Sequence, residues 1–394
     1  MMRLALITET YAPDINGVSM TLEHWCQGLA QRGVTIDLVR PGSATPYLKG
    51  LNTWQAAGHP LPGYPDLRFG WCLPRRVKRF WAYQRPDVFY IATEGPLGLS
   101  ALRYAKRHQI PVVAGFHTNF DQYLDAYSRL PLKPLAMKYL RWFHNQAHLT
   151  LTPSAEQQRA LTRQGFERVK RLGRGVDTQL FTPQKRCQYF RARLGVGPEQ
   201  LLVGYVGRLA KEKNLDLLLE SFQAIQKDRP NARLLLVGDG PLRQQITKQF
   251  PQAICVGMQQ GEALARYYAN LDLFIFPSLT ETYGNVVAEA MASGTPVLAY
   301  ERAAAAELIT HAMNGYLVSA YSDQPTRQFC TAARHLASDE HRLVVMGHLA
   351  SQRMQTQSWG QINQSFYQLL HSLILPEVSH EPENAARYTT LSTD

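Results

Sequence analysis

The sequence predicts an α/β protein made of two doubly wound, Rossmann-like lobes that face a central cleft. Short apolar runs that read as buried strands alternate with stretches of helical spacing along most of the chain. This alternation is typical of a parallel sheet covered by helices on both faces. At 394 residues the chain is also longer than the ~250 to 300 residues at which a single core stops growing. Two lobes of similar size fit both observations.

The first lobe is expected to cover residues 1–178. Its first strand is predicted at residues 3–8, and the Pro and Gly of the next segment break structure before a helix over 18–33. Further strands are predicted at 34–39, 88–92, 111–114 and 149–152, with a helix over 97–108. We expect the strand at 149–152 to be the last of this lobe. Ligands of such sheets lie beyond the carboxyl ends of the strands.

The second lobe is expected to cover residues 179–358. A linker rich in Gly and Pro, at 173–183, precedes a second series of strands and helices. Strands are predicted at 201–206, 232–237, 253–256, 273–276 and 296–299, and helices at 214–227, 242–249, 262–269 and 284–293. The amphipathic pattern over 359–375 predicts a closing helix, and the polar residues 376–394 predict a flexible tail.

Composition excludes several classes of protein. A hydrophobic fraction of 45% is that of a packed protein and not of a disordered one. The five cysteines are scattered and contain no CxxC pair, so neither a disulfide framework nor a zinc site is indicated. No segment approaches ~20 uninterrupted apolar residues, and the first residues lack the pattern of a signal peptide. We therefore expect a cytoplasmic protein that attaches peripherally to the cytoplasmic membrane face.

The net charge of +11 belongs entirely to the first half of the chain. Residues 1–182 carry 23 Lys and Arg against 12 Asp and Glu, whereas residues 183–394 carry 19 of each. A basic lobe beside a neutral lobe suggests a polyanionic partner, which could be a nucleic acid, an anionic lipid surface or a phosphorylated ligand. Charge that merely keeps the protein soluble is the alternative.

Candidate donor-binding residues follow two predicted strands of the second lobe. Arg208 and Lys213 follow the strand at 201–206, where an arginine fork and a lysine ammonium can hold a diphosphate. Glu281 follows the strand at 273–276, and the helix that begins near Gly284 offers unpaired N–H groups to a phosphate or sugar oxygen. Glu289 lies within that helix, where a carboxylate can accept hydrogen bonds from sugar hydroxyls.

At these positions the chain resembles the retaining glycosyltransferases of the GT-B fold, family 4. Glu281 and Glu289 match the E-x7-E signature of that family, and Gly207, Arg208 and Lys213 match its donor-phosphate motif. Other matching segments lie at 16–18, 93–98, 116–120, 173–177 and 238–241, so that the resemblance covers about residues 3 to 375. It is closest to the branch that contains the GDP-mannose-dependent α-mannosyltransferases and the sulfoquinovosyl-diacylglycerol synthases.

The resemblance implies that the first lobe, 1–178, binds the acceptor and that the second lobe, 179–358, binds the nucleotide sugar. It also implies a role for each matching residue. Glu281 would bind hydroxyls of the transferred sugar, and His117 would lie near that sugar on the first lobe, although an isolated histidine can equally be a structural hydrogen-bond partner. Arg208 and Lys213 would hold the diphosphate and stabilise the charge of the departing nucleotide. The remaining donor-binding residues would be Gly17, whose backbone could approach the phosphates, the block formed by Tyr283, Gly284, Asn285 and Val286, and Glu289 at the ribose.

No metal or cofactor is expected beyond the nucleotide-sugar donor itself. The sequence contains no D-x-D triplet, which agrees with the metal-independent mode of this fold. The family implies retention at the anomeric carbon, with the acceptor hydroxyl attacking from the front face and the leaving phosphate assisting.

Two basic stretches of the first lobe are candidates for a membrane-facing surface. One contains Arg75, Arg76 and Arg79 beside large apolar residues, and the other spans residues 127–143. Basic groups with large apolar neighbours suit an anionic bilayer interface. The alternative is that the apolar residues are helix core and that the charges are only solvated.

The predicted function is transfer of a hexose, most simply mannose from GDP-mannose, to a lipid or lipid-linked glycan. UDP-sugar-dependent transfer of glucose or sulfoquinovose to diacylglycerol is the nearest alternative. A nucleotide-sugar epimerase of the same fold is disfavoured because the E-x7-E block reads as a transferase. A protein that only binds nucleic acid or an anionic surface would explain the charge, but no nucleic-acid-binding motif supports the nucleic-acid version. A dehydrogenase is disfavoured because neither first βα turn contains G-x-G-x-x-G.

Overall fold

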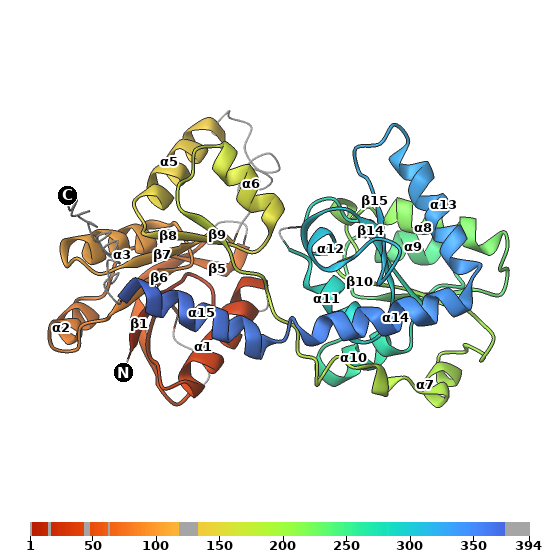
Figure 1. Ribbon diagram of the computed structural model, residues 1–394, viewed down its shortest axis with the longest axis horizontal. Coiled ribbons are helices and arrows are strands. Elements are labelled where there is room, and N and C mark those ends of the chain that lie inside the picture. The colour runs from red at the N-terminus through yellow and green to blue at the C-terminus, as the bar shows by residue number, and fades with distance from the viewer. Residues whose placement is uncertain are drawn as a thin grey trace, which may run out of the picture.

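The computed structural model describes residues 2–14, 17–42, 48–61, 64–117, 133–281 and 283–374. The chain forms two α/β lobes that lie side by side, as the sequence predicts (Figure 1). The expected tail at 376–394 and part of the segments 16–18, 116–120 and 127–143 lie outside the described residues.

The first lobe is built on a parallel sheet that contains seven strands within the described residues, in the order β3-β2-β1-β6-β7-β8-β9. Its strands are β1 Arg3–Ile7, β2 Thr35–Pro41, β3 Leu51–Ala56, β6 Val88–Ile91, β7 Val112–Gly115, β8 Leu149–Thr152 and β9 Val169–Arg171. The antiparallel pair β4 Gly58–Leu61 and β5 Tyr64–Gly70 lies beside it. The helices of this lobe are α1 Gly17–Gln31, α2 Arg75–Tyr83, α3 Pro96–Arg107, α5 Lys133–Asn145 and α6 Ala155–Arg163.

The second lobe is built on a parallel sheet that contains six strands within the same ranges, in the order β12-β11-β10-β13-β14-β15. Its strands are β10 Leu202–Val206, β11 Arg233–Val237, β12 Ile254–Cys255, β13 Leu273–Phe276, β14 Val297–Tyr300 and β15 Tyr316–Val318. Its helical elements are η1 Pro183–Lys185, α7 Gln188–Arg193, η2 Lys211–Lys213, α8 Leu215–Gln226, α9 Arg243–Gln249, α10 Gly261–Ala269, α11 Asn285–Ala292, α12 Ala303–Leu308, α13 Pro325–Ala337 and α14 Glu340–Gln355.

Both sheets reverse their strand order at one point, and the candidate site residues follow the strands at that point. In the first sheet the reversal lies between β1 and β6, and in the second it lies between β10 and β13. Loops that leave such neighbouring strands in opposite directions open a crevice at the carboxyl edge of the sheet. Arg208 and Glu281 follow β10 and β13, and Gly17 opens the helix after β1.

One predicted element of the first lobe is wrong. The strand at 149–152 is not the last of this sheet, because β9 pairs with β8 beyond it. Sequence reasoning missed β9 because only three residues, Val169, Lys170 and Arg171, form it, and two of these are exposed cations. An edge strand with one solvated face does not need the apolar run by which a buried strand is found.

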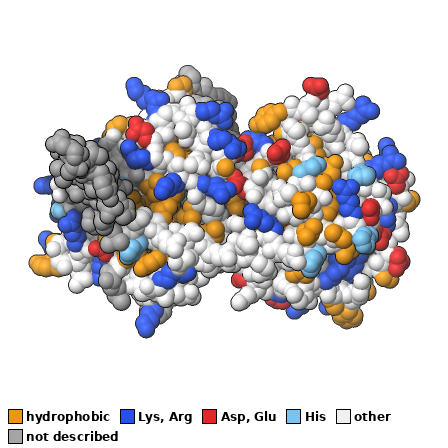
Figure 2. All heavy atoms as spheres, in the orientation of Figure 1, with side chains coloured by type: hydrophobic (Ala, Val, Ile, Leu, Met, Phe, Trp, Pro, Cys, Tyr) orange, Lys and Arg blue, Asp and Glu red, His pale blue; other side chains and the backbone are white. Residues whose placement is uncertain are grey.

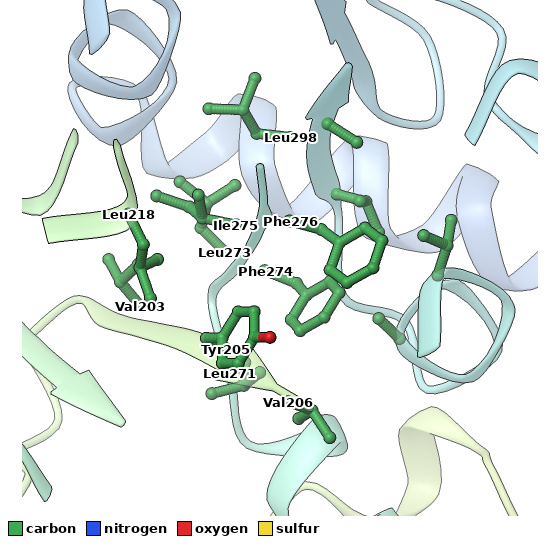
Figure 3. Packing of buried hydrophobic residues seen from close by; sticks show 14 of the residues in the cluster. Val203, Tyr205, Val206, Leu218, Leu271, Leu273, Phe274, Ile275, Phe276 and Leu298 are labelled. Carbon is green, nitrogen blue, oxygen red and sulfur yellow. The ribbon is translucent and has the colours of Figure 1, made fainter. Parts of the chain in front are cut away.

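The core of the second lobe explains why its strands were easy to predict. Every residue of β10 and β13 is buried, so each strand is a continuous apolar run. Figure 3 shows Tyr205 of β10 beside Phe274 and Phe276 of β13. The rings of Tyr205 and Phe276 are stacked at 6.4 Å, and those of Phe274 and Phe276 at 5.9 Å. This packing fixes the strand ends from which the site residues emerge.

The chain passes between the lobes twice, and the last helix returns to the first lobe (Figure 1). Helix α15, Trp359–Ile374, packs on α1, and its Phe366 is fully buried against Trp25 with ring centroids 4.3 Å apart. The two connections lie side by side, since the Val176 amide donates to the Gln357 carbonyl at 3.0 Å. The predicted closing helix is therefore part of the first lobe's core.

A second contact between the lobes joins α6 to α12. Glu307 of α12 accepts a hydrogen bond from the Ala155 amide at the start of α6 at 2.5 Å, and it also pairs with Arg171. In return, Glu156 of α6 accepts from the Ala303 amide at the start of α12 at 3.0 Å. Each lobe thus places a carboxylate at a helix N-terminus of the other, where the helix dipole favours negative charge.

Candidate functional site

Close backbone packing shapes the edge of the second lobe after β10 and β11. A Cβ on Gly238 would lie 1.9 Å from the Gly207 carbonyl oxygen, so any larger residue would collide with that backbone. The Leu209 amide donates to the Asp239 carbonyl at 2.9 Å, which joins the two loops. The loop that carries Arg208 is therefore held in place by its neighbour, which is consistent with a site that must be preorganised.

Lys213 and Glu281, predicted from two separate motifs, meet in the structure. The Lys213 ammonium lies 2.5 Å from Glu281 Oε1, and both side chains are about four-fifths buried. The Ser278 hydroxyl donates to the same carboxylate oxygen at 3.0 Å. A carboxylate with two donors on one oxygen keeps its other oxygen available to accept hydrogen bonds.

Arg208 is on the same loop but is largely exposed. Its guanidinium lies 3.8 Å from the Glu212 carboxylate one turn later, and 68% of its side chain is accessible. An exposed ion pair of this kind contributes little to stability, so Arg208 can exchange Glu212 for a stronger anion at small cost.

The predicted block after Glu281 forms the start of α11. Tyr283 is buried, and its hydroxyl lies 3.5 Å from the Arg174 carbonyl. Gly284 caps the helix, and Asn285 and Val286 occupy its first turn. The first N–H groups of a helix lack acceptors within the helix, and at this end the dipole attracts anions.

Glu289 lies one turn further along α11 and is partly buried. The Tyr268 hydroxyl donates to Glu289 Oε2 at 3.0 Å. Burial raises the pKa of this carboxyl to about 7, although the hydrogen bond from Tyr268 opposes that shift. The ionised Glu289 carboxylate is therefore less stable here than in water. Hydrogen-bond donors from a ligand would stabilise it.

Gly17 lies next to the Arg174 guanidinium. A Cβ on Gly17 would lie 2.8 Å from Arg174 Nη1 and 4.0 Å from Asn285 Nδ2. The same Arg174 Nη1 donates to Asn285 Oδ1 at 3.3 Å. Gly17 begins α1 and Asn285 begins α11, so the two helix N-termini and one buried guanidinium converge at one place between the lobes.

His117 lies at the end of β7 and is buried. Its Nε2 atom is 2.6 Å from the Tyr90 hydroxyl, whereas its buried Nδ1 atom has no hydrogen-bond partner among the residues that the structure describes. Burial, together with nearby Arg174 and His144, lowers the pKa of the ring to about 3, so the imidazole is neutral at ordinary pH. His117 and Arg174 line the same narrow cavity, which also contains Thr21 and Trp25.

The sequence reasoning missed Arg174, Tyr90, Ser278 and Tyr268 as parts of this arrangement. Arg174 lies between two glycines in the segment at 173–177, which the sequence marks only as a linker and a family match. A cation flanked by glycines between two sheets was an available signal. Nothing in the local sequence connects Tyr90 with His117 or Tyr268 with Glu289. The first pair meets because β6 and β7 are neighbours in the sheet, and the second because α10 packs against α11.

Of the two basic stretches, the one on α2 buries its main apolar residues in the core. Val77 and Trp81 are fully buried, and the Trp81 indole donates to Asp37 at 2.8 Å. Helix α5 differs, because Leu135 is 66% exposed and Trp142 47% exposed on one face with Tyr139, next to the exposed Lys138. Figure 2 shows Lys and Arg side chains spread over the visible face of both lobes.

Within the described residues, no group of three or more His, Cys, Asp or Glu side chains is placed to hold a metal ion. No helix in the described part of the chain combines the length and the apolar character that a bilayer crossing needs.

Comparison with known proteins follows the same division into lobes. A family model described as Glycosyltransferase Family 4 matches residues 15–180, and one described as Glycosyl transferases group 1 matches residues 200–359. A GDP-mannose-dependent alpha-mannosyltransferase of Mycobacterium tuberculosis is 31% identical over 360 residues, which are 89% of this chain and 89% of that protein. The sulfoquinovosyl transferase SQD2 of Arabidopsis thaliana is 29% identical over 365 residues, which are 91% of this chain and 71% of that protein. The solved structure of Anabaena HepE in complex with UDP and glucose aligns with a TM-score of 0.71 at 20% identity, covering 94% of this chain and all of that one.

Proposed function

The chain belongs to glycosyltransferase family 4, and from this premise we propose that it transfers mannose from GDP-mannose, with retention of configuration, to a lipid or lipid-linked glycan. It is a hexosyltransferase with a GT-B fold. The observation that carries the proposal is the Lys213–Glu281 pair beside the N-terminus of α11, at the strand reversal of the second sheet.

The pair changes partners when the donor binds. In the unliganded protein, Lys213 and Glu281 satisfy each other. A diphosphate offers Lys213 and Arg208 a stronger anion, and the Glu281 carboxylate then accepts hydrogen bonds from the hydroxyls of the sugar. Because negative charge accumulates on the departing nucleotide, these cations stabilise the transition state more than the ground state. We propose that they supply the positive charge and that no metal ion takes part.

His117 and Glu289 contact the two ends of the donor in this proposal. The neutral His117 ring has one nitrogen without a partner, so it can hydrogen-bond a sugar hydroxyl without adding charge. Glu289 accepts from the ribose hydroxyls. The acceptor hydroxyl attacks the anomeric carbon from the face of the leaving phosphate, which takes up the acceptor's proton as the bond to the nucleotide breaks.

A lipid acceptor is supported by helix α5. Its exposed face carries Leu135 and Trp142 with Lys138 between them, a combination suited to an anionic bilayer surface. Tyr139 of the same helix donates to the Glu94 carbonyl at 2.6 Å, which ties α5 to the loop after β6 at the carboxyl edge of the first sheet. We propose that α5 holds the cleft against the membrane.

The docking proposal has its own measurement. Replacing Trp142 and Lys138 together with Ser and Gln should weaken sedimentation with vesicles of anionic phospholipid by roughly 10-fold, since one exposed apolar side chain and one cation are lost. Affinity for GDP should stay unchanged. Vesicle binding equal to that of the wild type would overturn the membrane role of α5.

A donor panel tests the function as a whole. Purified protein is incubated with membrane lipid extract and radiolabelled GDP-mannose, UDP-glucose or UDP-sulfoquinovose, and lipid-soluble label is counted. Label from GDP-mannose alone is the expected result. Absence of transfer from every donor would overturn the proposal.

Transfer from a UDP-sugar to diacylglycerol is the second candidate. It is favoured by the similarity to the sulfoquinovosyl transferase SQD2, which extends over 91% of this chain. Label from UDP-sulfoquinovose or UDP-glucose without label from GDP-mannose would select it.

A further inference from the structure

We propose that Arg174 is a donor-binding residue, which contacts the sugar-linked phosphate of the nucleotide sugar from the first-lobe side of the cleft. This inference rests on the proposed function and adds a cation to which the resemblance assigns no role, although the segment 173–177 around it matches the family. It also assigns Gly17 a different purpose, which is to make room for the Arg174 guanidinium.

Arg174 is a buried cation that forms no ion pair within the described residues, although burial lowers its pKa and the charge of Glu281 acts on it and opposes that lowering. Its exposed fraction is 6%, and no carboxylate of the described residues forms an ion pair with it. Within the described residues its buried Nε atom has no hydrogen-bond partner, and Nη1 donates to the neutral Asn285 Oδ1 at 3.3 Å. Burying a charge that forms no ion pair is costly, so a guanidinium in this environment is suited to bind an anion.

The surroundings of Arg174 suit an anion and not a neutral group. The residue lies where the N-terminus of α1, at Gly17, meets that of α11, at Asn285. Both helices carry partial positive charge at these ends. The ring of Tyr283 lies 5.6 Å from the guanidinium carbon and stabilises the cation from the other side. A phosphate at this point would meet one full and two partial positive charges.

The other two donor-site cations already have carboxylate partners. Lys213 is paired with Glu281 at 2.5 Å and Arg208 with Glu212 at 3.8 Å. Each must leave a carboxylate before it holds a phosphate, whereas Arg174 gives up no ion pair. An arginine fork also binds two phosphate oxygens at once, which fixes the orientation of the phosphate.

Position along the donor follows from the neighbours of Arg174. It shares a narrow cavity with His117, which we assign to the sugar, and it is connected to the start of α11. The phosphate between the sugar and the rest of the nucleotide is therefore the one within its reach. In GDP this is the terminal phosphate, which GMP lacks.

Calorimetric titration with GDP and GMP tests the assignment. Arg174→Gln should weaken GDP binding roughly 10- to 100-fold, the loss expected for hydrogen bonds to a charged group, and should leave GMP binding within about twofold of the wild type. Arg193→Gln, an exposed arginine on α7, is the matched control and should change neither. Unchanged GDP affinity in Arg174→Gln would overturn the inference.

A double-mutant cycle tests the role of Gly17. A methyl group on Gly17 would displace the guanidinium, so Gly17→Ala should weaken GDP binding about as much as Arg174→Gln does. The double variant should then be no weaker than Arg174→Gln alone. Multiplying effects would show instead that Gly17 approaches the phosphate itself.

The remaining outcomes separate this inference from the proposed function. If the wild type binds no nucleoside diphosphate, the proposed function fails and the inference with it. If Arg174→Gln keeps its GDP affinity but raises the KM for the lipid acceptor, the anion belongs to the acceptor and only the inference fails. Should Arg174→Gln not fold by circular dichroism, Arg174→Lys decides, because the lost fork should still weaken GDP several-fold while GMP stays unaffected.

Discussion

At the scale of single residues, Lys213 and Glu281 form the bond that we propose the donor replaces. Glu281 pairs with Lys213 and accepts from Ser278, so two donors fix the position of its carboxylate. A hydrogen-bond acceptor whose position is already fixed loses little conformational entropy when a substrate binds. The same pair also shields Lys213 from other anions.

Glu281→Gln separates sugar binding from nucleotide binding. The amide cannot make charge-assisted bonds to the sugar, so kcat for transfer should fall roughly 10- to 100-fold. Affinity for GDP should stay equal or rise, because Lys213 loses its competing carboxylate. Initial rates and calorimetry measure the two effects, with Glu262→Gln on the exposed part of α10 as the control. Unchanged kcat would remove Glu281 from the mechanism.

Glu289 predicts a particular pH dependence. Its pKa is about 7 in the folded protein against 4.5 for the ordinary group, so the folded state holds this proton more tightly than the unfolded state. The stability that Glu289 contributes is therefore present below pH 4.5 and is lost as the pH rises through 7. Melting temperatures of Glu289→Gln and wild type should diverge between pH 5 and 8, in favour of the variant at high pH. Parallel melting profiles would contradict the shift.

The chemistry of the site residues could be predicted from sequence more readily than their partners could. Glu281 and Lys213 come after buried strands, and parallel strands bring the loops at their carboxyl ends to one edge of the sheet. Arg174 comes after the edge strand β9, which sequence reasoning missed. Its place in the cleft could therefore not be predicted from the sequence. The pairing of Tyr90 with His117 depends on two strands that are neighbours only in the sheet.

At the scale of elements, the buried parallel strands were predictable and the surface elements were not. The predicted strand at 273–276 coincides with β13, and the predicted helix at 284–293 contains α11. Sequence reasoning missed β3 and the β4–β5 pair because no continuous apolar run marks their sequences, and most residues of β3 are exposed or half-buried. Closing helix α15 was found because its buried stripe faces α1.

Gly238 tests the loop packing beside Arg208. Gly238→Ala brings a methyl group to 1.9 Å from the Gly207 carbonyl oxygen and should destabilise the fold by about 3 kcal/mol, the sum of overpacking and backbone strain. Gly195 also has a positive φ, of 71°, but a Cβ there meets nothing within 4 Å, so Gly195→Ala should cost only about 1 kcal/mol. Urea unfolding measures both. An equal loss of unfolding free energy in the two variants would show that the loops of Gly207 and Gly238 are not packed against each other.

At the scale of the whole molecule, two connections join the lobes. One is the pair of chain crossings at Val176 and Gln357, and the other is the contact between α6 and α12. The reciprocal pair Glu156 and Glu307 stabilises the arrangement in which Arg174 reaches Asn285. Because both lobes contribute to the site, donor binding depends on how often the lobes adopt this arrangement.

Removing both carboxylates should open the molecule. Glu156→Gln with Glu307→Gln deletes two contacts between a carboxylate and a helix N-terminus, which are worth about 1 to 2 kcal/mol together. The ratio of molecules that keep the α6–α12 contact to molecules that have lost it should therefore fall roughly 5- to 30-fold. Small-angle X-ray scattering should show a larger radius of gyration without donor, and added GDP-mannose should reverse the increase. An unchanged scattering curve would mean that α15 and the crossings alone fix the lobes.

The two lobes differ in net charge and also in the candidate site residues that they carry. The neutral second lobe carries Arg208, Lys213, Glu281 and Glu289. The basic first lobe carries helix α5 and the segment 173–177, which contains Arg174. The excess of +11 is thus attached to the lobe to which we assign the acceptor, and this lobe also carries Arg174, the buried cation that we propose to contact the donor.

The configuration of the product is the most direct test of hexosyl transfer in this cleft. Proton nuclear magnetic resonance of the purified lipid product made from GDP-mannose, followed through the anomeric proton and carbon, reports the linkage. One α-linked mannose for each GDP released is the predicted result, and Glu281→Gln should yield the same linkage at a lower rate. A β-linked product, or release of GDP without any glycosidic product, would contradict the proposed reaction.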